Sequence, residues 1–486
     1  MHLSFSCTFA PSKKKMLSDN ALRYTLKHLF AVALPSDEAL DFTFEVENER
    51  LHIVFADDCR IDLALFSDEE HEAFLNGEAT PTLLASADKN IQIPVFTPQS
   101  ALDTRLDGQY AQRLLNIPYD LVTPSFALLS REEEYRGLPR DEHNRFLFAY
   151  SLTRRYDCIS FPLVDEYAML LRQWISDYLK PNITIRPRAY RFIPTHDIDI
   201  LHRFTGTFQA YKSIFGRDLL INHSLNDVRK SLQEYRDWKD DHLKDPYISA
   251  IQELIQLSQQ HHLSSIFFFK SIVPEESDCT YDIAGEEVRF AIQQIRNAGM
   301  EVGLHGSYNS YNDAAIFRAE KARIEQMLCT PIVSNRQHYL RFCLQRNLAN
   351  YQSRSVYATQ EVASSQVSHQ NTLQVWQEAG LQHDYTLGYA EQPGFRCGTC
   401  HPYPLYDLDN DEPTNIIEHP LIVMDGSLFD YLQLNIADSN QLINRLLSRC
   451  RAVEGDFVIL WHNHLLSRNY RTRFEEVYAH QLKSNH

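Results

Sequence analysis

Glycine is scarce in this sequence of 486 residues, where it occurs only 15 times, or about three per cent. Proteins use about seven per cent glycine on average, and collagen-like chains use about a third. Hydrophobic residues make up 44% of the chain, which is enough to build a large core. The composition therefore argues against collagen-like, repeat and disordered architectures. At roughly 100–200 residues per domain, the length predicts two or three globular domains.

Basic residues are also in short supply. The chain has 47 Lys and Arg against 64 Asp and Glu, which gives a net charge of −17 at pH 7. Proteins that bind nucleic acid through its phosphates need clustered Lys and Arg. We therefore expect no nucleic-acid partner.

Long apolar runs, export signals and disulfide patterns are missing as well. No stretch approaches the roughly 18 apolar residues of a membrane span, and Ile266-Phe267-Phe268-Phe269 predicts a buried strand instead. No apolar segment follows Lys13-Lys14-Lys15 as in a secretory signal, and nine cysteines stand at irregular positions. These features predict a reduced, cytoplasmic protein with no membrane span. Phosphate-binding glycine loops and serine-nucleophile elbows are absent too, which disfavours kinases and α/β-hydrolases.

The first 180 residues predict a mixed α/β domain of unknown role. Strand formers at 41–46 and 51–55 suggest a hairpin, and the charge run at 131–135 predicts a solvated helix face. Lys180-Pro181-Asn182 interrupts the pattern, so the predicted boundary separates residues 1–180 from 181–486.

After residue 181 apolar strands alternate with amphipathic helices. Strands are predicted at 265–269, 300–304 and 457–461, and helical apolar spacing occurs around 248–258, 288–295, 375–379 and 442–450. Strands that are apolar throughout indicate a parallel sheet covered by helices on both faces. The predicted fold class is α/β, with a distorted (β/α) barrel preceded by a smaller mixed α/β domain.

Reactive side chains follow the predicted strands. They are Asp197 and Asp199, His305, the segment from Arg336 to Tyr339, Asp384 and His462. In parallel α/β folds the carboxyl ends of the strands form the active site. Each residue alone is more often structural, but together they supply carboxylate and imidazole ligands for a divalent metal, a base and an acid. The set predicts metal-assisted hydrolysis.

Several segments resemble the polysaccharide deacetylase family, the NodB-homology carbohydrate esterases, and more closely an uncharacterised bacterial branch of it. They are Thr195-His196-Asp197-Ile198-Asp199, Gly303-Leu304-His305-Gly306-Ser307-Tyr308, Arg336-Gln337-His338-Tyr339 and Ile459-Leu460-Trp461-His462-Asn463. The segment from Asp384 to Ala390, Gly394-Phe395-Arg396 and an upstream stretch at 125–131 resemble the same branch. The resemblance implies a distorted (β/α) barrel that hydrolyses the N-acetyl group of a sugar with the help of a metal ion.

The resemblance also implies a role for individual residues. Asp197 resembles the general base, His462 the general acid, and Arg336 the arginine that orients the base. Asp199 and His305 resemble metal ligands. Tyr339, whose backbone N–H is expected to face the oxyanion, is assigned to substrate binding together with Asp384 and Arg396.

Two departures from the family pattern leave alternatives open. Ile198 separates aspartates that are adjacent in the family, so the roles of Asp197 and Asp199 could be exchanged. The family's second histidine is Asn309 here, and an amide is a weaker zinc ligand than imidazole. We therefore hypothesise that His338, which stands where the family has proline, supplies the third ligand.

Cys397-Gly398-Thr399-Cys400-His401 matches the pattern for covalent haem attachment. Such attachment requires export, and a single CxxC is half of a zinc-thiolate site, so a tight loop with two incidental thiols is favoured. Redox activity of the two cysteines stays open.

The sequence thus predicts a cytoplasmic deacetylase that uses a divalent metal ion, with zinc favoured, and acts on a carbohydrate substrate. The alternatives are hydrolysis of another non-peptide C–N bond in a small metabolite and a non-catalytic carbohydrate-binding protein with a degenerate site. The sugar and the oligomeric state are not predicted.

Overall fold

The fold is described from a computed structural model of the chain. The structure describes residues 17–36, 41–109, 113–179, 185–206, 209, 225–272, 278–344, 370–466 and 470–484. Two compact units are present. The first comprises Met1–Ser130, Glu166–Arg186 and Tyr406–Glu412, and the second comprises Arg131–Asp165, Pro187–Leu405 and Pro413–His486. The predicted domain boundary between residues 180 and 181 lies outside the described residues.

The first unit contains a mixed sheet of five strands in the order β1-β2-β3-β7-β6. The predicted hairpin is confirmed, because β1 (Phe42–Glu47) and β2 (Arg50–Phe55) pair antiparallel. Asn48 and Glu49 join them with positive φ angles of 51° and 59°, which a two-residue hairpin turn favours. The other strands are β3 (Arg60–Ala64), β4 (Thr82–Ala85), β5 (Gln92–Val95), β6 (Asp107–Gln109) and β7 (Leu114–Ile117).

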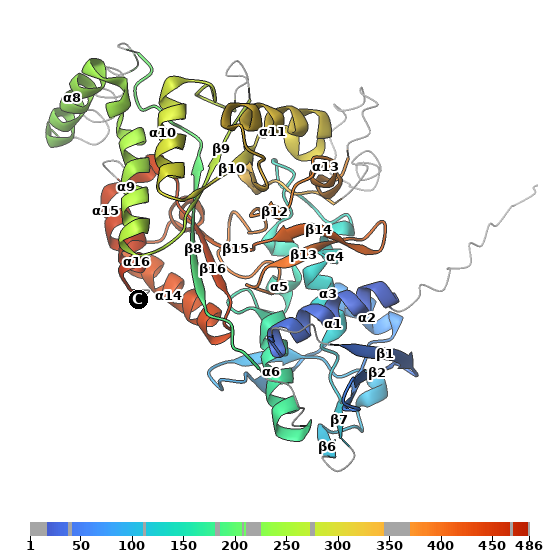
Figure 1. Cartoon of the computed structure of the whole chain (residues 1–486). Helices are drawn as coiled ribbons and strands as arrows, with labels where there is room; N and C mark the ends of the chain where they lie inside the picture. Colours follow the sequence, from blue (N-terminus) through green and yellow to red (C-terminus); the bar gives the residue numbers. More distant parts are fainter. Residues whose placement is uncertain are drawn as a thin grey trace, which may run out of the picture. The chain divides into compact units, whose positions relative to one another are not determined.

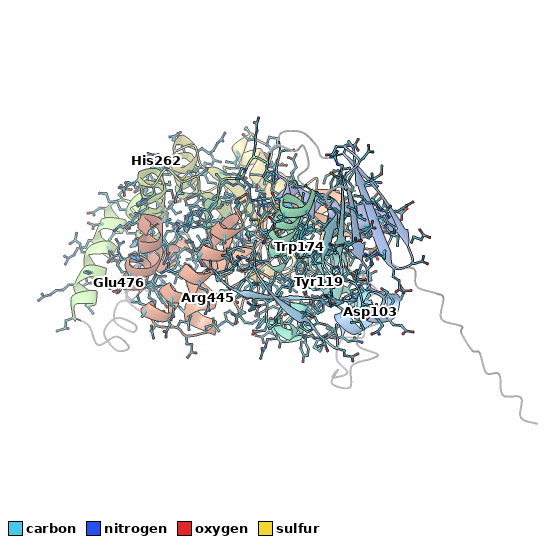
Figure 2. All side chains as sticks on the ribbon, turned by 90° about the horizontal axis from the view of Figure 1, so that it is seen from below. Asp103, Tyr119, Trp174, His262, Arg445 and Glu476 are labelled. Carbon is cyan, nitrogen blue, oxygen red and sulfur yellow. The ribbon has the colours of Figure 1, made fainter. Side chains whose placement is uncertain are left out.

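Helices complete the core of this unit. Phe30 of α1 packs edge-on against Phe42 and Phe55, with ring centroids 5.2 and 5.3 Å away. Tyr119 and Trp174, both labelled in Figure 2, have centroids 6.1 Å apart. The helices are α1 (Asp19–Ala33), α2 (Asp68–Leu75), α3 (Val122–Leu129) and α6 (Leu163–Trp174).

A second sheet, which belongs to the second unit apart from the residues of β13 and β14 within Tyr406–Glu412, has nine strands, most of which are visible in Figure 1. In spatial order they are β13 (Tyr403–Asp407), β14 (Glu412–Glu418), β12 (His383–Asp384), β11 (Ser334–Gln337), β10 (Glu301–Gly306), β9 (Ile266–Phe269), β8 (Arg191–Ile198), β16 (Asp456–Leu460) and β15 (Leu421–Met424). The pairs from β14 to β15 are parallel. All four residues of β9 are buried, as expected for a strand covered on both faces.

Helices between these strands cover the sheet. Helix α10 begins after Gly285, ends before Gly299 at φ +74°, and buries the apolar stripe that the sequence predicts. It packs on β10 together with α11, while α14 packs on β16 (Figure 1). The helices are α4 (Glu132–Tyr135), α5 (Leu152–Arg155), α8 (Leu225–Asp240), α9 (Pro246–Gln260), α10 (Glu286–Asn297), α11 (Ala314–Leu328), α13 (Thr372–Glu378), α14 (Ile436–Ala452), α15 (Arg471–Arg473) and α16 (Ala479–Ser484).

This architecture confirms the predicted α/β class, with a distorted, open (β/α) barrel and a separate smaller mixed α/β domain. The strands β13 and β15 are the edges of the sheet in the described part of the chain. No helix among the described residues is long and apolar enough to cross a membrane.

The prediction of a solvated helix face at 131–135 is wrong. Arg131, Glu133 and Glu134 are each only 1% exposed. The guanidinium of Arg131 lies 2.5 Å from Glu133 and 2.8 Å from Glu134, and Arg396 pairs with Glu134 at 2.7 Å. Charged residues are buried when such partners compensate them, and one of these partners, Arg396, comes from a distant part of the sequence.

Candidate metal centre

The reactive side chains meet at the carboxyl ends of the parallel strands, as the alternating pattern predicts. Asp197 lies near the end of β8, and Asp199 follows that strand directly. His305 belongs to β10, His338 follows β11, and His462 comes shortly after β16. Residues far apart in the sequence are therefore brought to one edge of the sheet.

Asp199, His305 and His338 form a group that could hold a metal ion. One potential ligand atom from each lies within 4.8 Å of the other two. The Oδ1 atom of Asp199 is 3.2 Å from Nε2 of His305 and 3.3 Å from Nε2 of His338. Asn309 is exposed, so the structure groups His338, and not Asn309, with the other two predicted ligands.

The hydrogen bonding of His305 fits a cation at this position. Its Nδ1 lies 2.8 Å from the carbonyl oxygen of Arg336, which can only accept, so a neutral ring carries its proton on Nδ1. The Nε2 lone pair then faces Asp199. Nε2 of His305 is buried without a hydrogen bond, and Oδ1 of Asp199, which faces it, forms an ion pair with Nζ of Lys270 at 3.0 Å. Two acceptors facing each other without a proton between them suit a divalent cation, and one carboxylate with two imidazoles is a common zinc donor set.

Asp199 is present as a carboxylate. Burial alone would raise its pKa, but the hydrogen-bonding and cationic groups around it, among them His462 and Lys270, outweigh burial and hold the pKa well below its usual range. A deprotonated carboxylate is the form that binds a metal ion.

A buried arginine holds Asp197 in place. Arg336 is completely buried, and its Nη1 lies 3.1 Å from Oδ1 of Asp197 and 2.8 Å from Oγ1 of Thr195. Its Nε donates to the carbonyl oxygen of Tyr385. Asp197 also lines the cavity, so its carboxylate is both oriented and accessible to a small molecule.

His462 is paired with Asp425, which the sequence analysis missed. Nδ1 of His462 lies 2.8 Å from Oδ1 of Asp425, and Nε2 lies 3.4 Å from Oδ2 of Asp199. Burial lowers the pKa of His462, but Asp425 and Asp199 together raise it well above its usual range. Asp425 directly follows β15, so the rule that selected the other residues would have found it.

Lys270 and Asp278 are two further charged groups that the sequence analysis missed. Lys270 directly follows β9, and its Nζ is 3.0 Å from Oδ1 of Asp199. Asp278 Oδ1 is 2.5 Å from Nδ1 of His338. Lys270 stands at a strand end too, whereas no sequence signal marks Asp278.

A cavity of about 250 Å³ opens onto these groups. Asp197, Asp199, His305, His338 and His462 all line it.

The rim of this cavity carries aromatic and cationic side chains. Tyr339 and Tyr431 line it with 43% and 46% of their surface exposed. Arg145 lies between them, since it donates to the carbonyl oxygen of Tyr339 and to the hydroxyl of Tyr431. The two tyrosines present flat apolar faces to a bound molecule, while Arg145 is largely buried and is paired with Asp141 at 2.7 Å.

Two residues assigned to substrate binding lie away from this cavity. Asp384 is fully buried and accepts hydrogen bonds from Asn335 and Thr386. Arg396 is buried in the ion pair with Glu134. Neither lines the cavity, whereas Tyr339 does.

The CxxCH segment is a buried loop. Cys397 and Cys400 are free thiols, fully buried, and burial raises the pKa of both. Nε2 of His401 lies 2.8 Å from the carbonyl oxygen of Val453. The histidine is thus engaged with the backbone.

Comparisons with known proteins give a partial match and distant structural neighbours. Residues 13–180 match a family of unknown function, DUF7033. No curated protein matches the chain.

Solved structures resemble about three fifths of the chain. A Mycobacterium smegmatis protein assigned as a polysaccharide deacetylase shares 15% identity over 63% of this chain and 86% of its own, with a TM-score of 0.35. A Pseudomonas aeruginosa PAO1 protein with the same assignment shares 14% identity over 61% of this chain and 85% of its own, with a TM-score of 0.33. The allantoinase Puue shares 12% identity over 61% of this chain and 84% of its own, with a TM-score of 0.32.

Proposed function

We propose that this chain is a metal-dependent hydrolase that removes an N-acetyl group from a carbohydrate. The observation that carries the proposal is the arrangement around one cavity of a candidate metal group, an arginine-held aspartate and an aspartate-held histidine. The motifs that resemble polysaccharide deacetylases supply the choice of the N-acetyl group.

Asp199, His305 and His338 would hold the ion. When bound there, a divalent ion polarises an amide carbonyl and lowers the pKa of water. The remaining chemistry belongs to side chains of the chain itself.

Asp197 would act as the base. Its carboxylate accepts a proton from the attacking water, whose oxygen forms the new bond to the acyl carbon. Arg336 fixes the direction of that carboxylate through its contact with Oδ1, which leaves Oδ2 for the proton.

His462 would act as the acid. Its pKa is raised by Asp425 and Asp199, so the ring is protonated at neutral pH. As the C–N bond breaks, the ring gives a proton to the leaving amine, and the products are acetate and a free amino sugar. Asp425 is paired with Nδ1, so the proton for the leaving amine comes from Nε2.

The size of the cavity supports a small reacting group. Its volume of about 250 Å³ lies below the about 300–1,000 Å³ of pockets that enclose drug-sized ligands. An acetamido group would enter it while the rest of the sugar contacts Tyr339 and Tyr431 at the rim. A cytoplasmic location, which we propose from the cysteine usage, would make the substrate a soluble precursor and not a cell-surface polymer.

The test is acetate release from N-acetylglucosamine and its oligomers after zinc has been supplied to metal-free protein. We expect zinc-dependent release, and loss of about 10²-fold or more in rate for Asp197→Asn and for His462→Ala. Asp240→Asn and His242→Ala, both exposed and remote from the cavity, are the matched controls. Zinc-loaded protein that releases no acetate from these sugars would overturn the proposal, and release of another amine or ammonia from a small metabolite would favour the alternative hydrolase.

A further inference from the structure

A buried lysine already occupies part of the candidate metal group. The side chain of Lys270 is only 2% exposed, and its Nζ lies 3.0 Å from Oδ1 of Asp199 and 3.0 Å from Nε2 of His338. The same Nζ donates to the carbonyl oxygen of Asp278 at 2.8 Å. Lys270 does not line the cavity, so these contacts position its ammonium against the donor atoms and not against a substrate.

The proton on His338 sits on Nδ1, so Lys270 contacts the unprotonated nitrogen Nε2. Nδ1 of His338 lies 2.5 Å from Oδ1 of Asp278, a carboxylate that can only accept. A neutral ring therefore carries its proton on Nδ1 and presents a lone pair at Nε2. That lone pair accepts from Lys270, and it is the same lone pair that a metal ion would need.

Lys270 is held as a cation. Its Nζ forms ion pairs with Asp199 at 3.0 Å and with Asp278 at 3.4 Å, and its side chain is buried beside both carboxylates. The ammonium thus compensates the charge of Asp199 in the protein without metal, where a lone buried carboxylate would be costly.

We infer that Lys270 is a built-in competitor for the metal ion at Asp199 and His338. The inference rests on the metal group of the proposed function. Metal binding requires both donor atoms to exchange the lysine ammonium for the ion. Two cations at one carboxylate repel each other, so the lysine lowers the affinity of the site for any divalent ion and eases release of the ion. The chain therefore favours a loosely held, exchangeable metal.

The experiment compares zinc affinity in the wild-type protein and in Lys270→Met, which keeps the length of the side chain and removes its charge. A chromophoric chelator competes for zinc, so the readout does not depend on activity. We expect Lys270→Met to bind zinc about tenfold to a hundredfold more tightly. Lys239→Met, at an exposed position on α8, is the control and should leave the affinity unchanged. Equal or weaker zinc binding by Lys270→Met would overturn the inference.

Removal of the charge also predicts opposite effects on stability with and without metal. Metal-free Lys270→Met should unfold at a lower temperature than the wild type, because Asp199 loses its cation, and zinc should raise its midpoint by more than it raises that of the wild type. If Lys270→Met does not fold, a crystal structure of the zinc-bound wild type tests whether Lys270 competes with the ion. Nζ of Lys270 displaced from Asp199 supports the competition, and Nζ retained at 3.0 Å overturns it.

Failure of this inference differs from failure of the proposed function. Equal zinc affinities with zinc-dependent acetate release would refute the role of Lys270 and leave the deacetylase intact. Tighter zinc binding by Lys270→Met without acetate release from either protein would support the role of Lys270 and refute the deacetylase.

Discussion

Nδ1 of His462 lies 2.8 Å from Oδ1 of Asp425, and the backbone N–H of His462 donates to the other oxygen of the same carboxylate. Asp425 is completely buried. One carboxylate thus fixes both the position of the main chain and the orientation of the ring, which is how a histidine is held ready for proton transfer.

The first prediction concerns this pair. Asp425→Asn should lower kcat for acetate release by about 10²-fold or more with little change in KM, because the neutral amide no longer stabilises the protonated ring that acts as the acid. Steady-state kinetics measure both constants, and Asp240→Asn is the control. An unchanged kcat would show that His462 does not depend on Asp425.

The third metal ligand can be assigned by mutation. His338→Ala should lose stoichiometric zinc after dialysis, while Asn309→Ala, at an exposed position shortly after the neighbouring strand β10, should retain it. Elemental analysis of the two purified proteins measures the difference. Full zinc occupancy in His338→Ala would contradict the assignment of this residue.

Arg336 should stabilise the fold through its pairing with Asp197. Arg336→Met leaves the Asp197 carboxylate buried without its partner, so the free energy of unfolding should fall by about 3–5 kcal/mol. The double variant with Asp197→Asn should lose less than the sum of the two single changes, because the unpaired charge is gone. Urea unfolding of the four proteins tests this, and strict additivity would argue against coupling.

Glu320 should make stability depend on pH. Burial raises its pKa from 4.5 to about 7, although hydrogen bonds from Ser307 and Ser310 lower it in part. The folded protein therefore binds this proton more tightly than the unfolded chain, and the associated stability is present below about pH 4.5 and lost as the pH rises through 7.

Glu320→Gln removes that titration. Relative to the wild type, its free energy of unfolding should change little at pH 5 and rise by about 2–3 kcal/mol at pH 8–9. Chemical unfolding at a series of pH values gives the comparison, with the exposed Glu286→Gln as control. A constant difference between Glu320→Gln and the wild type across this range would show that Glu320 does not titrate as described.

Arg396 offers a test of a structural role against a role in substrate binding. It makes a bidentate pair with Glu134, at 2.7 and 2.8 Å from the two carboxylate oxygens. Arg396→Lys keeps the charge but loses the paired contact, so stability should fall by about 1–3 kcal/mol while KM stays unchanged. A raised KM with unchanged stability would restore the assignment to substrate binding.

The reactive residues of the candidate site could be found from the sequence because of one physical rule. Parallel strands bring their carboxyl ends to one edge, so polar residues that follow apolar strands gather there, as Asp199, His305, His338 and His462 do. The hairpin, the barrel class and the apolar stripe of α10 follow equally from local periodicity and turn chemistry.

Which partner each charged group takes was decided only by the tertiary structure. Asp425 pairs with a histidine 37 positions away, Lys270 with a histidine 68 positions away, and Glu134 with an arginine 262 positions away. Pairing of Glu134 with the distant Arg396 also completes the burial of the 131–135 charge run that the sequence places in solvent, and compensation by a distant charge leaves no local trace. The periodicity of the sequence thus determined where chemistry can occur, while folding determined how each charge is compensated and so which residues can bind a metal ion.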